Sequence, residues 1–396
     1  MKINFISLVN PYRKIVTGGS EDIRRRIAAV AREYDVDVLA VDNISEQTPH
    51  RKVPPKINLT IYPRKTILNP AKWLMPIPVF TRYNASLIKE LKERLETDEK
   101  QVNVIEGLQS CLLWLGIPHR VRAQHYSILR LHNIESNYHK ALANTVMDFT
   151  RYIHLLTSWQ YKWFEAKVFP LFDEIHVISR QEIEVLTDLY PQIANKLRWV
   201  PPLVDIKEQK DGRNNMAITD KELPINRQNY KIGYFGDLNI ALNVEGLKWF
   251  LNSGWLTICK AVKYAELHIA GHNSELFKGY EHVYTHGFVE DLDEFINGLD
   301  VLIVPIQNGA GVKIKVIDSI AWGKPLVTTS VGIEGTDDQL QRLVWINDEI
   351  NDFSNSLLRI HDNYREAWKQ AQRAKEWIST CYDAESCINK FAALTL

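Results

Sequence analysis

The sequence of 396 residues lacks any apolar run that approaches the roughly 18 residues of a membrane span. Its N-terminus, MKINFISLVNPYRK, has a short apolar stretch without a small-residue cleavage site, so we expect a first strand there. Only four cysteines are present, at positions 111, 259, 381 and 387, and none forms a C-x-x-C pair. Because they are too few for a disulfide framework, we expect a cytoplasmic, reducing environment.

The sequence also has few features of a metal or nucleic-acid site. No D-x-D follows a strand and no His/Asp set has ligand spacing, which predicts a metal-independent protein without a cofactor. The net charge is zero and no recognised nucleic-acid module is present, so we expect no nucleic-acid partner.

The charge is unevenly distributed along the chain. Residues 1–200 carry 28 Lys and Arg against 21 Asp and Glu, and much of the excess lies in 51–100. There the basic residues mix with Trp73, Leu74, Met75 and Phe80. This mixture is compatible with a peripheral surface for anionic lipid head groups at the inner membrane face, but it favours the alternative of a solvated edge beside a core-facing loop.

The length and the 45% apolar content predict two globular domains. An apolar run at 2–9, the TGGS loop at 17–20 and a helical period after it form the opening unit of a nucleotide-type βαβ fold. Alternation of strands and helices predicts parallel sheets covered on both faces. Further strands are expected at 35–42, 56–62, 102–108, 126–132 and 174–180, and then at 231–239, 265–273, 300–306 and 324–332.

The pattern is interrupted by a polar, charged segment at 197–229. We therefore expect an N-terminal domain at 1–203 and a C-terminal domain at 204–374. The tail is helical in period and broken near Cys381–Tyr382, and its last part, 375–396, is expected to pack back on the first domain.

The most informative stretch is 300–335, in which a buried strand ends at Pro305 and a glycine loop opens a helix. Backbone N–H groups at a helix N-terminus can hold a pyrophosphate, and Lys313 and Lys315 add positive charge. Lys315 and Asp318 lie three residues apart on a neighbouring face of the helix, which could face a cleft; an exposed ion pair is the alternative.

The segment GAGVKIKVIDSIAWGKPLVTTSVGIEG (309–335) resembles the donor-binding motif of the retaining family 4 glycosyltransferases, which belong to the glycosyl transferases group 1. The resemblance extends over most of the chain and implies the GT-B architecture, an α/β fold with two Rossmann-like domains facing each other across a cleft and C-terminal helices. Other matching pieces are TGGS, RLHNIES (130–136), WVPPLVD (199–205), IGYFGDLNIALNVEGLKWF (232–250), LHIAG (267–271) and THGFVEDLDEFI (285–296).

The resemblance also implies that the first domain binds the acceptor and the second binds the nucleotide sugar. It assigns donor contacts mainly to residues of the second domain. Asp318 would accept hydrogen bonds from the ribose hydroxyls. Gly236 would lie below the phosphates, and Gly18 and Gly19 would close over the donor from the other domain. The remaining expected donor contacts are Phe288 and Val289 at the base, and Gly309, Gly311, Val312, Lys313 and Lys315 at the diphosphate. The family has a glutamate where this chain has Ala310, and a second where it has Asp318, so the sugar contacts must differ.

In the N-terminal domain His132 is expected to contact the reacting sugar or the acceptor, and to act catalytically with Lys313 and Lys315. Glu106 and Glu135 are expected at the acceptor. A structural, hydrogen-bonded histidine and a helix-capping or solvated Glu106 are the alternatives.

The resemblance implies transfer of a hexose-type sugar from a nucleotide diphosphate sugar to a glycan, lipid-linked or protein-linked acceptor, with retention of configuration, in polysaccharide biosynthesis. The nucleotide sugar is a substrate, so no cofactor is implied. A non-catalytic, glycan- or partner-binding subunit and a GT-B sugar-nucleotide epimerase are the alternatives.

Overall fold

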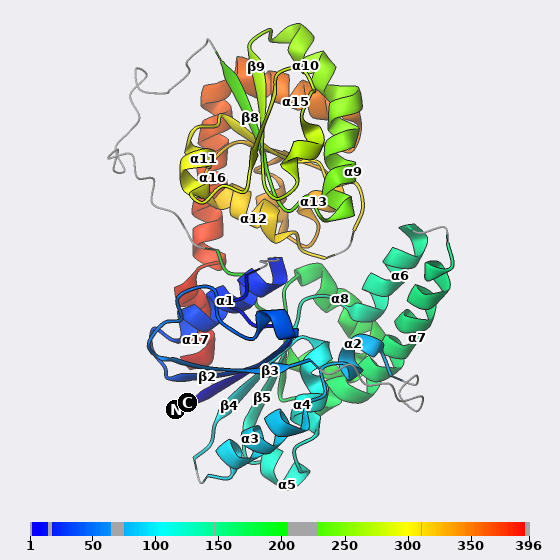
Figure 1. Cartoon of the computed structure of the whole chain (residues 1–396), viewed down its shortest axis with the longest axis vertical. Coiled ribbons are helices and arrows are strands. Elements are labelled where there is room, and N and C mark those ends of the chain that lie inside the picture. Colours follow the sequence, from blue (N-terminus) through cyan, green and yellow to red (C-terminus); the bar gives the residue numbers. More distant parts are fainter. Residues whose placement is uncertain are drawn as a thin grey trace. The chain divides into compact units, whose positions relative to one another are not determined.

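A computed structural model describes residues 2–14, 18–64, 75–97, 99–145, 148–204, 229–309 and 311–392. The chain divides into two compact units (Figure 1). Unit 1 contains Met1–Leu203 together with Tyr382–Leu396, and unit 2 contains Val204–Cys381.

Unit 1 is built on a parallel sheet with the strand order β3-β2-β1-β4-β5-β6-β7. Its central strands are buried along their whole length, as expected for a parallel sheet that helices cover on both faces. The strands are β1 (Ile3–Ser7), β2 (Val36–Asp42), β3 (Ile57–Pro63), β4 (Val102–Glu106), β5 (Tyr126–Leu131), β6 (Glu174–Val177) and β7 (Leu197–Trp199).

Helices fill the space on the two faces of this sheet and create two apolar clusters. Helix α1 buries Ile23, Ile27 and Val30 in one cluster, and the last helix of the chain, α17, contacts α1 and adds Cys387 to it (Figure 1). The helices of unit 1 are α1 (Gly18–Val30), α2 (Ile77–Phe80), α3 (Ala85–Leu95), α4 (Cys111–Leu115), α5 (His119–Arg122), α6 (Glu135–Thr145), α7 (Thr150–Val168), α8 (Arg180–Leu189) and α17 (Ala384–Ala392).

Unit 2 repeats this plan with a parallel sheet in the order β10-β9-β8-β11-β12-β13 and one apolar cluster. Its strands are β8 (Tyr230–Phe235), β9 (Ala265–Ala270), β10 (Val283–Gly287), β11 (Val301–Val304), β12 (Leu326–Thr328) and β13 (Trp345–Ile346). Its helices are α9 (Ala241–Trp249), α10 (Leu256–Ala261), α11 (Leu292–Asn297), α12 (Ile314–Ala321), α13 (Ser330–Ile333), α14 (Asp338–Gln341), α15 (Ile350–Asp362) and α16 (Tyr364–Cys381).

In both sheets the chain starts near the middle, proceeds to one edge and then crosses back to the other side. The switch point lies between β1 and β4 in unit 1 and between β8 and β11 in unit 2. In such sheets, ligands bind beyond the carboxyl ends of the strands next to the switch point. The loops that follow β1, β4, β8 and β11 are therefore the places where each unit is built to hold a ligand.

The strands that the sequence analysis expects are all present in this arrangement, and three short ones, β7, β10 and β13, were not expected. Helix α16 runs through residue 374, where the sequence-based boundary lay, and ends at Cys381.

Candidate functional site

At the carboxyl end of β8, the backbone of unit 2 lies directly against the side chain of Lys315. A Cβ atom at Gly236 would lie 2.5 Å from Lys315 Nζ and 2.9 Å from its Cε. Only a residue without a side chain allows the lysine to reach this position below the main chain. Gly236 and Lys315, two of the expected phosphate-site residues, are thus brought together.

Lys315 is held by neutral groups. Its Nζ donates to Tyr234 Oη at 2.8 Å and to Asn243 Oδ1 at 2.9 Å, and it lies 4.5 Å from the centre of the Tyr234 ring. Desolvation lowers the pKa of Lys315 to about 7, although the charge of Asp237 acts in the opposite direction. Within the described part of the chain no carboxylate forms an ion pair with Lys315, so its charge is available to an incoming anion.

The glycine loop before α12 has the backbone conformation that the motif predicts. Gly309 and Gly311 have φ values of +123° and +80°, which non-glycine residues rarely adopt, and Lys313 is the N-cap of α12. Ala310 lies outside the described residues, and Val312 is half-buried.

Lys313 differs from Lys315 in already having a counter-charge. Its Nζ donates to the Gly311 carbonyl at 2.5 Å and lies 3.3 Å from Glu334 Oε2. The role of both lysines at a diphosphate stays a prediction, and of the two only Lys313 has a counter-charge among the described residues. Lys313 must exchange Glu334 for the ligand or serve to fix the loop.

The expected base-binding residues follow β10 at the same edge of the sheet. Phe288 is 66% exposed and stacks on His272, with ring centres 4.9 Å apart and an angle of 20° between the planes. Val289 is half-buried. This leaves an open aromatic face on which a base could stack. Asp318 is half-buried on α12, about one helical turn beyond Ile314.

In unit 1, α1 begins with two glycines and carries buried charges from one turn further on. Gly18 is exposed at the start of α1, and a Cβ at Gly19 would meet nothing within 4 Å. Asp22 and Arg26, one helical turn apart on α1, are fully buried.

These two residues belong to a buried ion cluster at the carboxyl ends of β4 and β5. Arg26 Nη1 lies 2.9 Å from Glu106 Oε1, and Arg130 Nη2 lies 3.2 Å from Asp22 Oδ2. His132 Nε2 approaches Glu106 Oε2 at 3.3 Å, and the His132 side chain is 16% exposed. Of these five, only His132 reaches the surface.

Glu106 is neither the solvated nor the capping carboxylate of the alternative interpretation. It is 0% exposed, and although burial would raise its pKa, Arg26 and His132 lower that pKa to about 2. Both carboxylate oxygens accept from Arg26 and the side chain is fully buried, so its contact with an acceptor stays a prediction that would require this cluster to open. The approach of Glu106 Oε2 to His132 Nε2 at 3.3 Å is a close contact without hydrogen-bond geometry.

Glu135, at the start of α6, is a different kind of buried carboxylate. Burial raises its pKa to about 7; Gln109 lowers it by hydrogen bonding, and the charge of Glu165 raises it further. The group thus changes protonation near neutral pH, as a proton-exchanging group in a binding site would.

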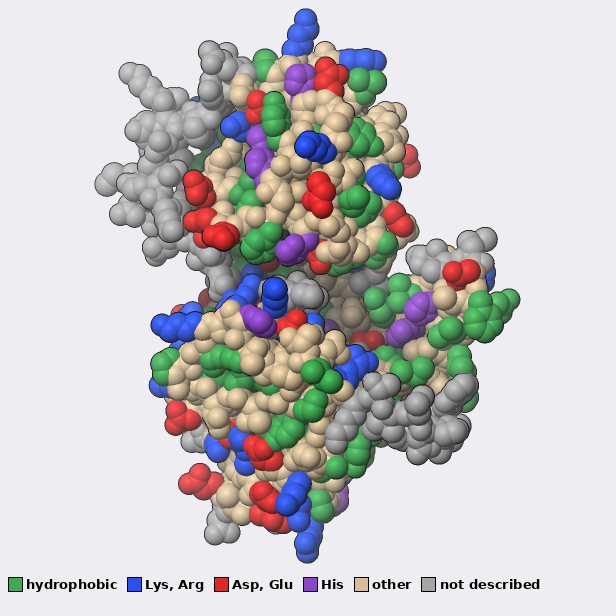
Figure 2. All heavy atoms as spheres, in the orientation of Figure 1, with side chains coloured by type: hydrophobic (Ala, Val, Ile, Leu, Met, Phe, Trp, Pro, Cys, Tyr) green, Lys and Arg blue, Asp and Glu red, His purple; other side chains and the backbone are tan. Residues whose placement is uncertain are grey.

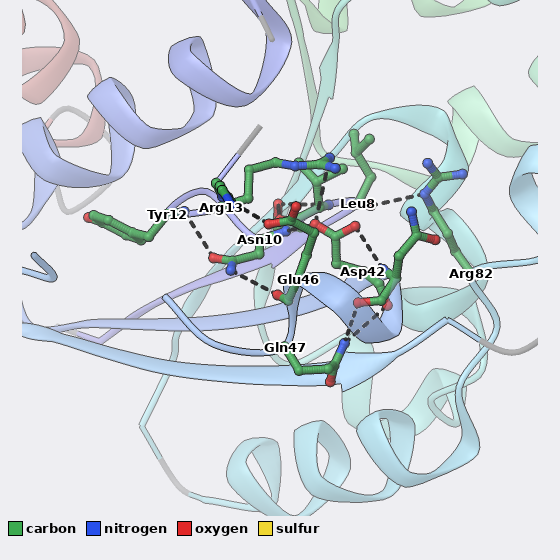
Figure 3. Close-up of polar contacts among 12 residues, drawn as sticks. Leu8, Asn10, Tyr12, Arg13, Asp42, Glu46, Gln47 and Arg82 are labelled. Atoms are coloured by element: carbon green, nitrogen blue, oxygen red, sulfur yellow. Dashed lines mark hydrogen bonds and ion pairs between the residues drawn. The ribbon is translucent and has the colours of Figure 1, made fainter. Parts of the chain in front are cut away.

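Sequence analysis missed a polar cluster beside the carboxyl ends of β1 and β2, which Figure 3 shows. Asn10 N donates to Asp42 Oδ2 at 2.8 Å, and Asn10 Nδ2 donates to the Glu46 carbonyl at 3.0 Å. Arg82 Nε donates to the Leu8 carbonyl at 3.0 Å. The signal that could have revealed this cluster is the polar run that directly follows an apolar strand at residue 10.

Arg82 also carries a positive charge that no ion pair within the described ranges neutralises. Burial, followed by the charge of the neighbouring Arg64, lowers the pKa of Arg82 to about 10. Arg64 itself donates to Thr81 Oγ1 at 2.6 Å. Trp73 and Leu74 of the candidate lipid-facing segment lie outside the described residues, and so does Thr17 of the TGGS loop.

No helix in the described part of the chain is long and apolar enough to cross a membrane. Among the same residues no three His, Cys, Asp or Glu side chains are grouped so that they could hold a metal ion.

Comparison with known proteins adds a family match over part of the chain and a fold to this geometry. Residues 229–363 match the family model of glycosyl transferases group 1. An uncharacterized 44.6 kDa protein in the cps region of Klebsiella pneumoniae is 26% identical over 272 residues. That match covers 65% of this chain and 65% of the relative, so the chain matches just under two thirds of the relative's length.

Solved structures resemble the chain over nearly its whole length. HepE of Anabaena, solved in complex with UDP, has a TM-score of 0.67 at 14% identity and covers 100% of this chain and 99% of its own. WaaG, a glycosyltransferase involved in lipopolysaccharide biosynthesis, has a TM-score of 0.65 at 17% identity and covers 99% of both chains. The two parallel sheets and these likenesses confirm the expected GT-B fold.

Proposed function

Because the chain has the GT-B fold and matches glycosyl transferases group 1 over residues 229–363, we propose that it transfers a hexose-type sugar from a nucleoside diphosphate sugar to a glycan, lipid-linked or protein-linked acceptor. The donor is proposed to bind unit 2, and the acceptor is proposed to bind unit 1. The observation that carries this proposal is the ammonium group of Lys315, held by neutral partners below Gly236 at the switch point of the sheet.

Negative charge grows on the diphosphate as the bond between the sugar and the diphosphate of the donor breaks. Lys315 and the N–H groups of the Gly309–Val312 loop are proposed to stabilise that charge, which exists only late in the reaction. Because its pKa is about 7, Lys315 is only partly protonated at neutral pH before the donor binds. A bound diphosphate would raise that pKa and keep the lysine positively charged. No metal ion is needed for this role.

We further propose that transfer retains the anomeric configuration. In that scheme the acceptor oxygen attacks on the face that the diphosphate leaves, and a phosphate oxygen of the donor takes the acceptor proton. The only protein group required near the acceptor is one that orients it, and His132, partly exposed and beside Glu106, is suited to that task.

The proposal is tested by calorimetric titration with nucleoside diphosphates, beginning with UDP because HepE was solved with UDP. We expect Lys315→Met to weaken UDP binding at least about tenfold, which is the loss of about one charge-assisted contact. Lys248→Met is the matched control, because Lys248 is exposed on α9 of the same unit and lies outside the loops of the site.

The titration of Lys315 gives a second readout. UDP affinity of the wild type should fall as the pH rises from 6.5 to about 9, with uptake of a proton on binding, and Lys315→Met should remove this dependence. If folded wild-type protein binds no nucleoside diphosphate at millimolar concentration, the transferase proposal fails. The non-catalytic, partner-binding subunit would then be the better account.

A further inference from the structure

Helix α7 of unit 1 has an apolar face on its solvent side. Its inner side buries Thr157, Gln160, Tyr161, Phe164, Glu165 and Val168. Its outer side exposes Tyr152, Leu155, Leu156, Trp159 and Trp163, by 66%, 41%, 54%, 64% and 49%. These five positions recur at three- and four-residue spacing and form one continuous stripe, here called the α7 apolar face.

A helix on the surface of a globular protein normally turns polar side chains outward. Single exposed apolar residues are common, but a stripe with two tryptophans marks an interaction surface. Phe149 and Ile153, exposed by 75% and 46%, extend the stripe at the start of the helix. Figure 2 shows hydrophobic side chains gathered over α6 and α7.

The charges beside the stripe are mostly positive, and the exception is the exposed Asp148, which precedes α7 and accepts a hydrogen bond from Thr150 N at 2.9 Å. Arg151, Lys162 and Lys167 are exposed on α7. The only acidic residue of the helix, Glu165, is buried and accepts hydrogen bonds from Ser136 Oγ at 2.6 Å and Tyr190 Oη at 2.9 Å. Between Thr150 and Val168 the outer side of α7 therefore presents aromatic, aliphatic and cationic groups, and the neighbouring anionic group is Asp148 at its start.

The stripe is rigidly supported from behind by α6. Ser158 Oγ of α7 donates to the Ser136 carbonyl of α6 at 2.7 Å. His139 of α6 stacks on Tyr161 of α7, with ring centres 5.4 Å apart. In Figure 1 the two helices form a hairpin at the margin of unit 1, away from its sheet. The apolar face is thus a fixed surface.

We propose that the α7 apolar face lies in the interfacial layer of an anionic lipid bilayer. Tryptophan and tyrosine place an apolar ring in the acyl boundary and a polar atom among the head groups, and leucine adds buried apolar area. Arg151, Lys162 and Lys167 would meet the lipid phosphates. A second copy of the chain fits less well, because two such faces would oppose like charges with no acidic residue of α7 between them.

This surface belongs to a different segment from the basic run at 51–100, which is compatible with a membrane contact. It also does not depend on the proposed sugar transfer, because its test is a binding measurement on the full chain without donor or acceptor.

The test is co-sedimentation with vesicles of phosphatidylcholine, with and without phosphatidylglycerol. We expect wild-type protein to bind the phosphatidylglycerol vesicles, and the double variant Trp159→Ser/Trp163→Ser to bind them at least about tenfold more weakly. Leu256→Ser is the matched control, because Leu256 is 56% exposed on α10 of unit 2. Since all three side chains are exposed, the thermal midpoint should stay unchanged in each variant.

The charges are tested separately. Arg151→Gln/Lys162→Gln should reduce the preference for phosphatidylglycerol and the salt dependence of binding. Absence of vesicle binding by the wild type, or equal binding by the tryptophan variant, would overturn the proposal. So would light scattering that shows a wild-type dimer which Trp159→Ser converts to monomers, because the face would then bind a second copy.

Discussion

The two sheets have the same kind of strand order, with a switch point near the middle. The chemical groups at the carboxyl ends of their strands are different. In unit 2 the edge is mainly backbone and glycine, with Lys315 held by a phenol and an amide. In unit 1 it is a set of charged side chains that neutralise one another, Arg26 with Glu106 and Arg130 with Asp22.

The difference indicates how each edge can be used. An uncompensated cation with fixed N–H groups gains most of its electrostatic stabilisation when an anion arrives. A buried, paired cluster gains little from a ligand, and its one member that reaches the surface, His132, lies 3.3 Å from Glu106 Oε2. Unit 2 thus resembles a receptor for a diphosphate, and unit 1 resembles a paired cluster with a single histidine at the surface.

The largest effect should come from breaking the ion cluster of unit 1. Arg26→Met leaves Glu106 buried without its partner, which should cost about 3–5 kcal/mol of stability. Hydrogen exchange should show the loss in β1 and β4 of unit 1, while β8 and β11 of unit 2 keep their protection. Arg32→Met, an exposed arginine just after α1, is the control. A loss below about 1 kcal/mol would mean that the cluster does not support unit 1.

The corresponding test in unit 2 is steric. A Cβ at Gly271 would lie 1.8 Å from the Gly236 carbonyl oxygen, so Gly271→Ala must displace the backbone beside Lys315. We expect a loss of about 2–3 kcal/mol, together with weaker UDP binding. Gly279→Ala separates the two causes, because Gly279 has a φ of +105° but no atom within 4 Å of the added Cβ. Equal thermal midpoints for the two variants would assign the effect to backbone strain alone.

A pH-dependent effect should distinguish Glu135 from the paired carboxylates. Because burial raises its pKa to about 7, the folded protein holds this proton more tightly than the unfolded chain does between about pH 4.5 and pH 7. Unfolding then releases a proton, so this contribution to stability falls as the pH rises through that window. Relative to the wild type, Glu135→Gln should gain about 2 kcal/mol between pH 5 and pH 8. Urea titrations at the two pH values would measure this, and a parallel response would place the pKa of Glu135 near its usual value.

Sequence reasoning was most successful where structure depends on neighbouring residues. The buried strands and the positive φ values of Gly309 and Gly311 follow from local patterns of hydrophobicity and backbone freedom, and the structure contains both. The strands β7 and β13 are too short to show a period, so only their neighbours in the sheet reveal them.

The ion pairs could not be predicted from such local sequence patterns. Arg26 and Glu106 are separated by 80 residues, and the sequence around Glu106 gives no sign of its partner. The counter-charge of Lys313, Glu334, comes from beyond β12. Helix α7 presents the same difficulty, because its apolar residues surround the axis and only the packing against α6 decides which of them face solvent.

The smallest effect, and one of opposite sign, should come from Gly19 at the start of α1. An added Cβ there meets no atom within 4 Å, and Gly19 lies in a helix, where alanine is favoured over glycine. Gly19→Ala should therefore stabilise unit 1 by about 0.5–1 kcal/mol, in contrast to the loss expected for Gly271→Ala in unit 2.

Stability and ligand affinity need not change together in this variant. If Gly19 closes over the donor, as its resemblance to the family implies, a methyl group would obstruct the diphosphate and UDP binding would weaken while the thermal midpoint rises. A rise in the midpoint with unchanged affinity would leave Gly19 as an ordinary helix residue. The donor would then depend for its phosphate contacts on unit 2, where Lys315 and the loop at Gly309 are proposed to supply them.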